Sequence, residues 1–168
     1  MQSKIIVIGL GNPILGDDGV GWRVGELVQE KVRALCEKSS PDMQNVEVEC
    51  VSEGGLRLME IMIGCDRAIV VDALTTGYQP DGTITQFPLD MLPDACQGHI
   101  ASPHTTTLQN ALSMGRELGL HLPTQVLVIG IEAHKTYDFS ETLTPPVQAC
   151  LSHVVESVMD LIEQYQTD

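Results

Sequence analysis

Three runs of consecutive apolar residues constrain the fold of this chain more than any other feature of its sequence. The runs lie within residues 4–9, 67–72 and 125–131, where only the end positions are polar or charged, and they are rich in isoleucine and valine. Continuous apolar character over so few residues is typical of parallel strands that are buried on both faces. A sheet of such strands needs a layer of helices on each side, because neither face tolerates water.

The segments between these runs complete an α/β pattern. Alternating residues predict two further strands, at 46–51 near an edge of the sheet and at 83–87, which we expect to be antiparallel after the turn at 79–82. Apolar residues at helical spacing predict helices over about 19–37, 56–63, 102–120 and 147–165, with a loop between residues 90 and 102. Ser102 and Pro103 are the expected N-cap and first residue of the third helix.

These elements predict a three-layer α/β/α sandwich around a twisted, mostly parallel sheet of about five strands. The 168 residues suit one domain, so we assign residues 1–168 to a single domain. No internal repeat or linker interrupts the pattern. No apolar run approaches the roughly 18 residues that a membrane-spanning helix needs, and the N-terminal residues lack the pattern of a signal peptide. We therefore expect a cytoplasmic protein.

Charge and cysteine content exclude several classes of function. The chain has 23 acidic and 9 basic residues, a formal net charge of −14, which repels nucleic acid and anionic membranes. Its five cysteines form no C-x-x-C pair, so we interpret them as reduced core thiols and not as a disulfide framework or a zinc site.

Three side chains near the ends of apolar segments are the candidate site: Asp18, Asp72 and His104. Carboxyl ends of parallel strands meet at one edge of an open α/β sheet, where ligands bind. Two carboxylates and an imidazole form a plausible incomplete set of ligands for a divalent transition metal. Each residue also has a structural alternative, since aspartate often caps a helix or turn and a single histidine is often a surface residue. His99 is a second, weaker candidate for the imidazole.

The glycine-rich segment from Gly9 to Gly21, GLGNPILGDDGVG, superficially resembles a dinucleotide-binding turn. In that turn G-x-G-x-x-G leads directly into a helix that binds pyrophosphate. Here the third glycine is late, Pro13 intervenes, and Asp17 and Asp18 occupy the place of the phosphates. The segment therefore disfavours nucleotide binding, and one of its two aspartates is available for another role.

Together, this segment, the sequence IVVDA at 69–73 and the sequence SPH at 102–104 resemble the hydrogenase maturation proteases. These endopeptidases trim the large subunit of nickel-iron hydrogenases. The resemblance covers nearly the whole chain, and the glycine-rich element is its most specific part. Many relatives carry Asp-Gly-Gly-Thr after the second strand, whereas this chain has Glu53, two glycines and Leu56, so a role tied to that aspartate or threonine does not carry over.

The resemblance implies an α/β/α sandwich and a nickel-recognition site formed by Asp18, Asp72 and His104. It also implies that the nickel arrives with the substrate, a hydrogenase large-subunit precursor whose C-terminal extension is cleaved. We expect no organic cofactor and a monomeric enzyme. A tentative catalytic role falls to Asp18 and Asp72, as in an aspartyl-type protease.

The source of the nucleophile stays open at this point. A carboxylate could act as general base on water, or a bound divalent ion could acidify the water and polarise the carbonyl. The motifs H-E-x-x-H and G-x-S-x-G are absent, so zinc-peptidase and serine-hydrolase classes are disfavoured. Two other functions are alternatives: a maturation factor that binds the precursor or its nickel without hydrolysis, and a small-molecule enzyme that uses residues 9–21 as an anion loop.

Overall fold

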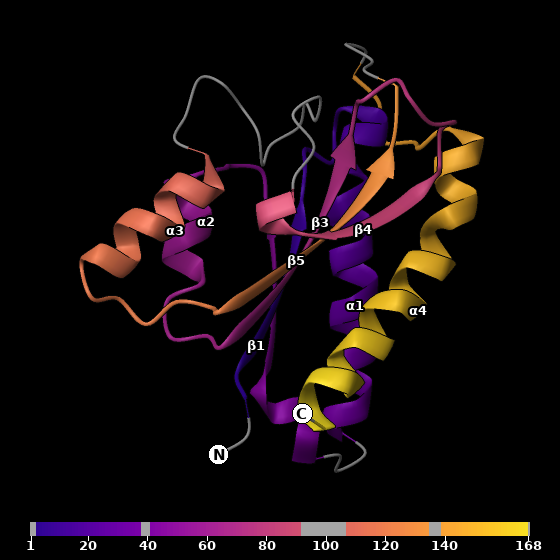
Figure 1. Ribbon diagram of the computed structural model, residues 1–168. Coiled ribbons are helices and arrows are strands. Elements are labelled where there is room, and N and C mark those ends of the chain that lie inside the picture. The colour runs from indigo at the N-terminus through magenta and orange to yellow at the C-terminus, as the bar shows by residue number, and fades with distance from the viewer. Residues whose placement is uncertain (1–2, 38–40, 92–106, 135–138, 168) are drawn as a thin grey trace.

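The three apolar runs form neighbouring strands in the middle of a five-stranded sheet (Figure 1). The computed structural model describes residues 3–37, 41–91, 107–134 and 139–167. The strands are β1 (Ile5–Leu10), β2 (Val46–Val51), β3 (Arg67–Leu74), β4 (Ile84–Pro88) and β5 (Gln125–Glu132). The α-helices of the described residues are α1 (Val20–Glu37), α2 (Leu56–Ile61), α3 (Leu108–Glu117) and α4 (Pro145–Thr167). Three short 3₁₀-helices are η1 (Gly16–Gly19), η2 (Pro41–Asn45) and η3 (Leu89–Met91).

The strand order is β2-β1-β3-β5-β4. The first four strands in this order are parallel to their neighbours, and β4 pairs antiparallel with β5. The predictions of a mostly parallel sheet, of β2 at an edge and of an antiparallel β4 are therefore confirmed. The carboxyl ends of β1, β3 and β5 lie together at one end of the sheet (Figure 1).

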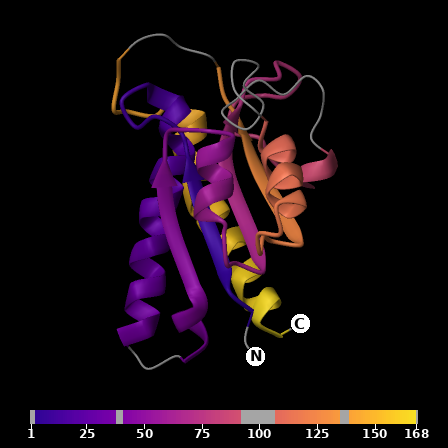
Figure 2. The same ribbon diagram turned by 90° about the vertical axis from the view of Figure 1, so that its left-hand side faces the viewer.

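Side chains of the central strands alternate between two cores, as the period of a strand requires. Ile5 and Val7 pack with apolar residues of α1 and α4, whereas Ile6 and Ile8 pack with those of α2 and α3. Two helices therefore cover each face of the sheet, and in Figure 2 the face with α2 and α3 is turned toward the viewer. The three-layer sandwich is the architecture that the sequence predicts.

Two element boundaries differ from the prediction. The third helix begins at Leu108, and Thr107, whose backbone is extended, is its N-cap. The predicted cap residues Ser102 and Pro103 lie outside the described residues. Its cap is the side chain of Thr107, which accepts a hydrogen bond from the backbone N–H of Asn110 at 3.3 Å. In addition, β3 does not end at Asp72: it continues to Leu74, because pairing with β5 extends to the register Leu74–Glu132.

None of the helices in the described part of the chain is both long and apolar enough to cross a lipid bilayer.

Candidate functional site

The turn after β1 is fixed by close contacts between glycines and neighbouring backbone. Gly11 has φ +143°, and a Cβ atom there would lie 2.0 Å from the carbonyl oxygen of Asp18. A Cβ atom on Gly21 would lie 2.2 Å from the carbonyl oxygen of Leu10 and 2.3 Å from that of Val71. The start of α1 therefore touches both β1 and β3, which brings the turn carrying Asp18 beside the strand that carries Asp72.

The backbone N–H groups of this turn are used within the protein. Gly11 donates to the Val51 carbonyl at 3.0 Å, and Gly16 donates to the Ser140 carbonyl at 2.6 Å. The N–H groups of residues 12, 14 and 15 also donate to acceptors inside the turn. A phosphate-binding loop needs such groups directed at the ligand. The geometry therefore agrees with the sequence in disfavouring nucleotide binding.

Asp17 and Asp18 have different surroundings. Asp17 is buried, with 1% of its surface exposed, and accepts two hydrogen bonds of 2.7 Å from the backbone N–H and the hydroxyl of Thr144. Thr144 directly precedes α4, so Asp17 ties the turn to the last helix. Asp18 is only partly buried, and its Oδ2 accepts from the backbone N–H of Asn12 at 3.0 Å. Asp17 thus has a structural role, and Asp18 is the less buried of the two aspartates.

Asp72 lies inside β3, opposite Gly130 of β5, and its side chain is fully buried at 0% exposure. Alternation along the strand places it on the same face as Val70 and Leu74, toward α2 and α3. A carboxylate rarely occupies such a position, because burial of a charge without compensation costs several kcal/mol. Its burial on a central strand makes Asp72 a candidate for a functional carboxylate.

His104 and His99 lie outside the described residues. Within the part of the chain that is described, no three histidine, cysteine, aspartate or glutamate side chains form a group that could hold a metal ion. Asp18 and Asp72 are therefore the two members of the predicted ligand set that the structure describes, and the third is not among those residues.

Glu132 is another carboxylate at the carboxyl end of the parallel strands, and sequence reasoning missed it. It ends β5, is 5% exposed, and accepts hydrogen bonds from the N–H of Thr76, the hydroxyl of Thr76 and the N–H of Gly77, at 2.8, 2.7 and 2.7 Å. The signal in the sequence is the acidic residue directly after an apolar strand, as at Asp72. These three hydrogen bonds hold the segment that follows β3 at the end of β5.

His134, just beyond β5, pairs through Nδ1 with Oδ1 of Asp81, which lies in the turn before β4. This hydrogen bond and the charge of Asp81 raise the pKa of His134 above its ordinary value of 6.5, and the more distant carboxylates of Glu132 and Asp17 act in the same direction. The carboxylates of Asp81, Glu132 and Asp17 therefore all favour the charged form of His134.

The described cysteines are free thiols. Burial raises the pKa of Cys50 to about 11, with smaller contributions from Glu26 and Glu49. Burial also raises the pKa values of Cys65 and Cys150. A nucleophilic cysteine needs a lowered pKa, so these three thiols are unsuited to protease chemistry. Among the described residues at the carboxyl end of the sheet, the carboxylates are groups that could activate water.

Residues 32–161 match the family model described as hydrogenase maturation protease. Among curated proteins, the chain is 30% identical over 150 residues to the hydrogenase expression/formation protein HupM of Azotobacter chroococcum mcd 1, covering 89% of this chain and 67% of that protein. It is 26% identical over 161 residues to the hydrogenase 2 maturation protease of Escherichia coli K12, covering 96% and 92%.

Solved structures agree at the level of the fold. The hydrogenase maturating endopeptidase HybD from E. coli superposes with a TM-score of 0.66 at 22% identity, covering 96% of this chain and 93% of that one. The similarity of sequence and the similarity of fold both extend over nearly the whole chain.

Proposed function

The chain belongs to the hydrogenase maturation protease family, a family of endopeptidases, and from this premise we propose that it cleaves the C-terminal extension from a hydrogenase large-subunit precursor. The substrate is a precursor that already carries nickel. The metal belongs to the substrate, and the protein recognises it before it cuts.

Support for metal recognition comes from the acidic edge of the sheet. The turn with Asp18 packs beside β3, which carries Asp72, and both residues are carboxylates. In the proposal His104 is the third ligand. Two carboxylates and an imidazole suit a divalent transition metal and leave positions for groups that the substrate supplies.

The burial of Asp72 is the single observation that carries the proposal. Asp72 has no exposed surface, and a divalent cation bound beside it would stabilise the charged form of its carboxylate. Loss of this residue should therefore affect metal recognition and cleavage more than folding. Asp18, which is partly exposed, is the side chain that a metal on a large substrate could reach first.

Hydrolysis requires a water molecule to attack the scissile carbonyl carbon while a base takes its proton. The C–N bond then breaks, and the proton passes to the leaving nitrogen, which gives a new carboxylate on the large subunit and a free amine on the extension. Asp18 or Asp72 is the base in one route; in the other, the divalent ion of the substrate acidifies the water. Both routes place the reaction at the end of the sheet where Asp18 and Asp72 lie.

The same proposal has the protein act as a monomer in the cytoplasm, with no organic cofactor and no nucleic-acid or membrane partner. The net charge of −14 supports the exclusion of polyanionic partners.

The test is cleavage of a purified nickel-loaded precursor, followed by intact-mass spectrometry. The wild-type protein should remove the mass of one C-terminal peptide, and Asp72→Asn should slow cleavage at least about 100-fold, a typical contribution of a catalytic proton-transfer group. Asp160→Asn is the matched control, because Asp160 is an exposed aspartate on α4.

Two results would contradict the proposal. An Asp72→Asn variant that processes the precursor at the wild-type rate would remove the residue from the site. A wild-type protein that forms a stable complex with an intact precursor would favour the alternative of a binding factor without hydrolytic activity.

A further inference from the structure

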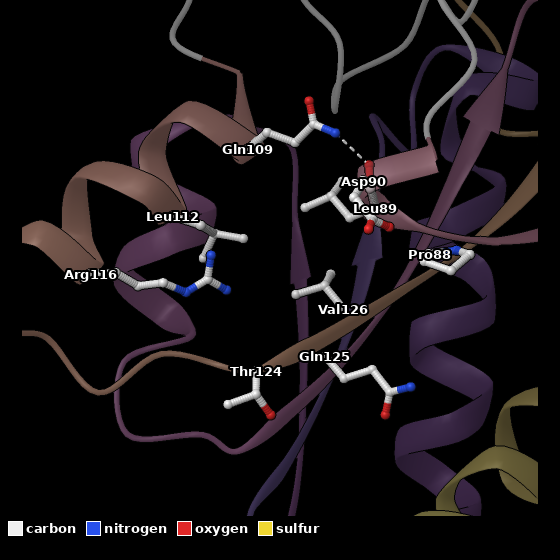
Figure 3. Close-up of a pocket in the computed structure, with 9 residues that line it drawn as sticks. All are labelled: Pro88, Leu89, Asp90, Gln109, Leu112, Arg116, Thr124, Gln125 and Val126. Atoms are coloured by element: carbon white, nitrogen blue, oxygen red, sulfur yellow. Dashed lines mark hydrogen bonds between the residues drawn. The ribbon is translucent and has the colours of Figure 1, made fainter.

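A pocket of about 470 Å³ lies between α3, the end of β4 and the start of β5 (Figure 3). Its floor is apolar and consists of the buried side chains of Leu89, Leu112 and Val126. Gln109 of α3 donates a 2.6 Å hydrogen bond to the carbonyl oxygen of Leu89, which joins the helix to η3 at one end of the pocket. The pocket thus combines an apolar base with a polar rim.

The rim carries two opposite charges that are not paired with each other. Arg116 extends from α3 over the pocket (Figure 3). Its Nη2 donates to the carbonyl oxygen of Pro123 at 2.7 Å. Among the described residues, no carboxylate is within ion-pairing distance of this guanidinium, although the chain has 23 acidic side chains. Asp90 lies on the opposite side of the pocket. A carboxylate ligand would therefore be attracted to the wall formed by α3 and repelled from the wall formed by η3.

The pocket and Asp72 lie on the same face of the sheet. Val126 pairs with Ala68 and Gly130 pairs with Asp72, so four residues of strand separate the pocket floor from the level of Asp72. At about 3.3 Å per residue, this separation is about 13 Å. An extended peptide of at least four residues spans it.

We propose that this pocket binds the carboxyl terminus of the precursor's extension, with an apolar last side chain on Leu89, Leu112 and Val126 and the terminal carboxylate on Arg116. The inference rests on the proposed function, because an extension removed from a C-terminus ends in a free carboxylate. A guanidinium is well suited to this group, since its planar donors match the two carboxylate oxygens. The scissile bond then lies toward the acidic edge while the end of the extension is held in the pocket.

The test is binding of a synthetic peptide with the sequence of the extension, labelled at its N-terminus and measured by fluorescence anisotropy with the full-length protein. Arg116→Gln should weaken binding about tenfold or more, because it removes a charge-assisted hydrogen bond. Arg33→Gln is the matched control: Arg33 is exposed on α1, on the opposite face of the sheet, and its replacement removes the same charge. The control should bind within about twofold of the wild type.

A second peptide with an amidated C-terminus identifies the group that is bound. The wild-type protein should bind the amidated peptide about tenfold more weakly than the acid. Arg116→Gln should bind the two peptides equally, since the amide and the substitution remove the same interaction. No binding at millimolar peptide, equal binding by Arg116→Gln, or equal binding of acid and amide would each overturn the inference.

Cleavage assays separate this inference from the proposed function. With the nickel-loaded precursor, Arg116→Gln should raise KM and leave kcat unchanged, whereas Asp72→Asn should bind the peptide normally and fail to cleave. If Arg116→Gln cleaved the precursor with the KM and kcat of the wild type, the pocket assignment would be wrong and the proposed function would stand. Absence of cleavage by the wild type would defeat the proposed function, and the peptide-binding result would still decide whether the pocket holds a carboxyl terminus.

Discussion

At the scale of single residues, Asp17 and Asp18 show how neighbours in sequence acquire separate roles. Their side chains are chemically identical, and the sequence selects Asp18 for the site mainly through the resemblance to the hydrogenase maturation proteases. The two aspartates differ because of Thr144, which is 127 residues away from Asp17. Its backbone N–H and its hydroxyl both donate hydrogen bonds to Asp17. Asp18 remains a candidate for the site, because it is Asp17 that accepts the hydrogen bonds of Thr144.

Alanine at each aspartate should therefore give opposite phenotypes. Asp17→Ala should lower the free energy of unfolding by about 2–4 kcal/mol, because it removes two buried hydrogen bonds to a charged acceptor. Asp18→Ala should change stability by less than about 1 kcal/mol and abolish precursor cleavage. Urea unfolding and intact-mass cleavage assays check the pair, and the assignment would be reversed if Asp18→Ala were the less stable variant.

The pair of His134 and Asp81 should give a measurable pH dependence. Because the pKa of His134 is raised above 6.5 in the folded protein, the stabilisation from this pair is fully present below about pH 6.5 and is lost as the pH rises through the raised pKa. An NMR titration of the imidazole should show the raised pKa, and Asp81→Asn should return it toward 6.5. A titration unchanged by Asp81→Asn would remove Asp81 as the cause.

At the scale of elements, the sequence predicts what depends on local periodicity. Apolar runs identify the central strands, and alternation identifies β2 and β4, since both patterns follow from side-chain direction within the strand. The start of α3 is wrong in the prediction because Ser102 with Pro103 and Thr107 are both acceptable N-terminal signals. The sequence also does not predict where β3 ends, because the end of this strand depends on the pairing of Leu74 with Glu132 of β5.

The contact of α1 with the sheet depends on Gly21, and alanine there should be strongly destabilising. Its Cβ would lie 2.2 and 2.3 Å from two backbone carbonyl oxygens, which cannot move without shifting β1 or β3. We expect a loss of at least about 2 kcal/mol in the free energy of unfolding. Gly119→Ala is the control, since its Cβ meets nothing within 4 Å and only the positive φ of +79° costs about 1 kcal/mol. Equal losses in the two variants would show that the close contact of Gly21 does not matter.

At the scale of the whole molecule, the site is assembled from segments that are far apart in the sequence. The prediction that Asp18 and Asp72 share one edge follows from the parallel sheet, which gathers the carboxyl ends of its strands. The roles of Asp17 and Glu132 could not be predicted, because their donors come from the segment before α4 and from the segment after β3. The pocket below Arg116 was equally hidden, since α3, β4 and β5 form it only in the folded chain.

In the proposed function, this protein recognises a metal on its substrate and then cleaves a peptide bond. The most direct measurement is intact-mass spectrometry of a hydrogenase large-subunit precursor, nickel-loaded or metal-free, after incubation with the wild-type protein. The nickel-loaded precursor should lose one C-terminal peptide, and the metal-free precursor should keep its full mass. Cleavage of both forms at the same rate, or of neither, would contradict it.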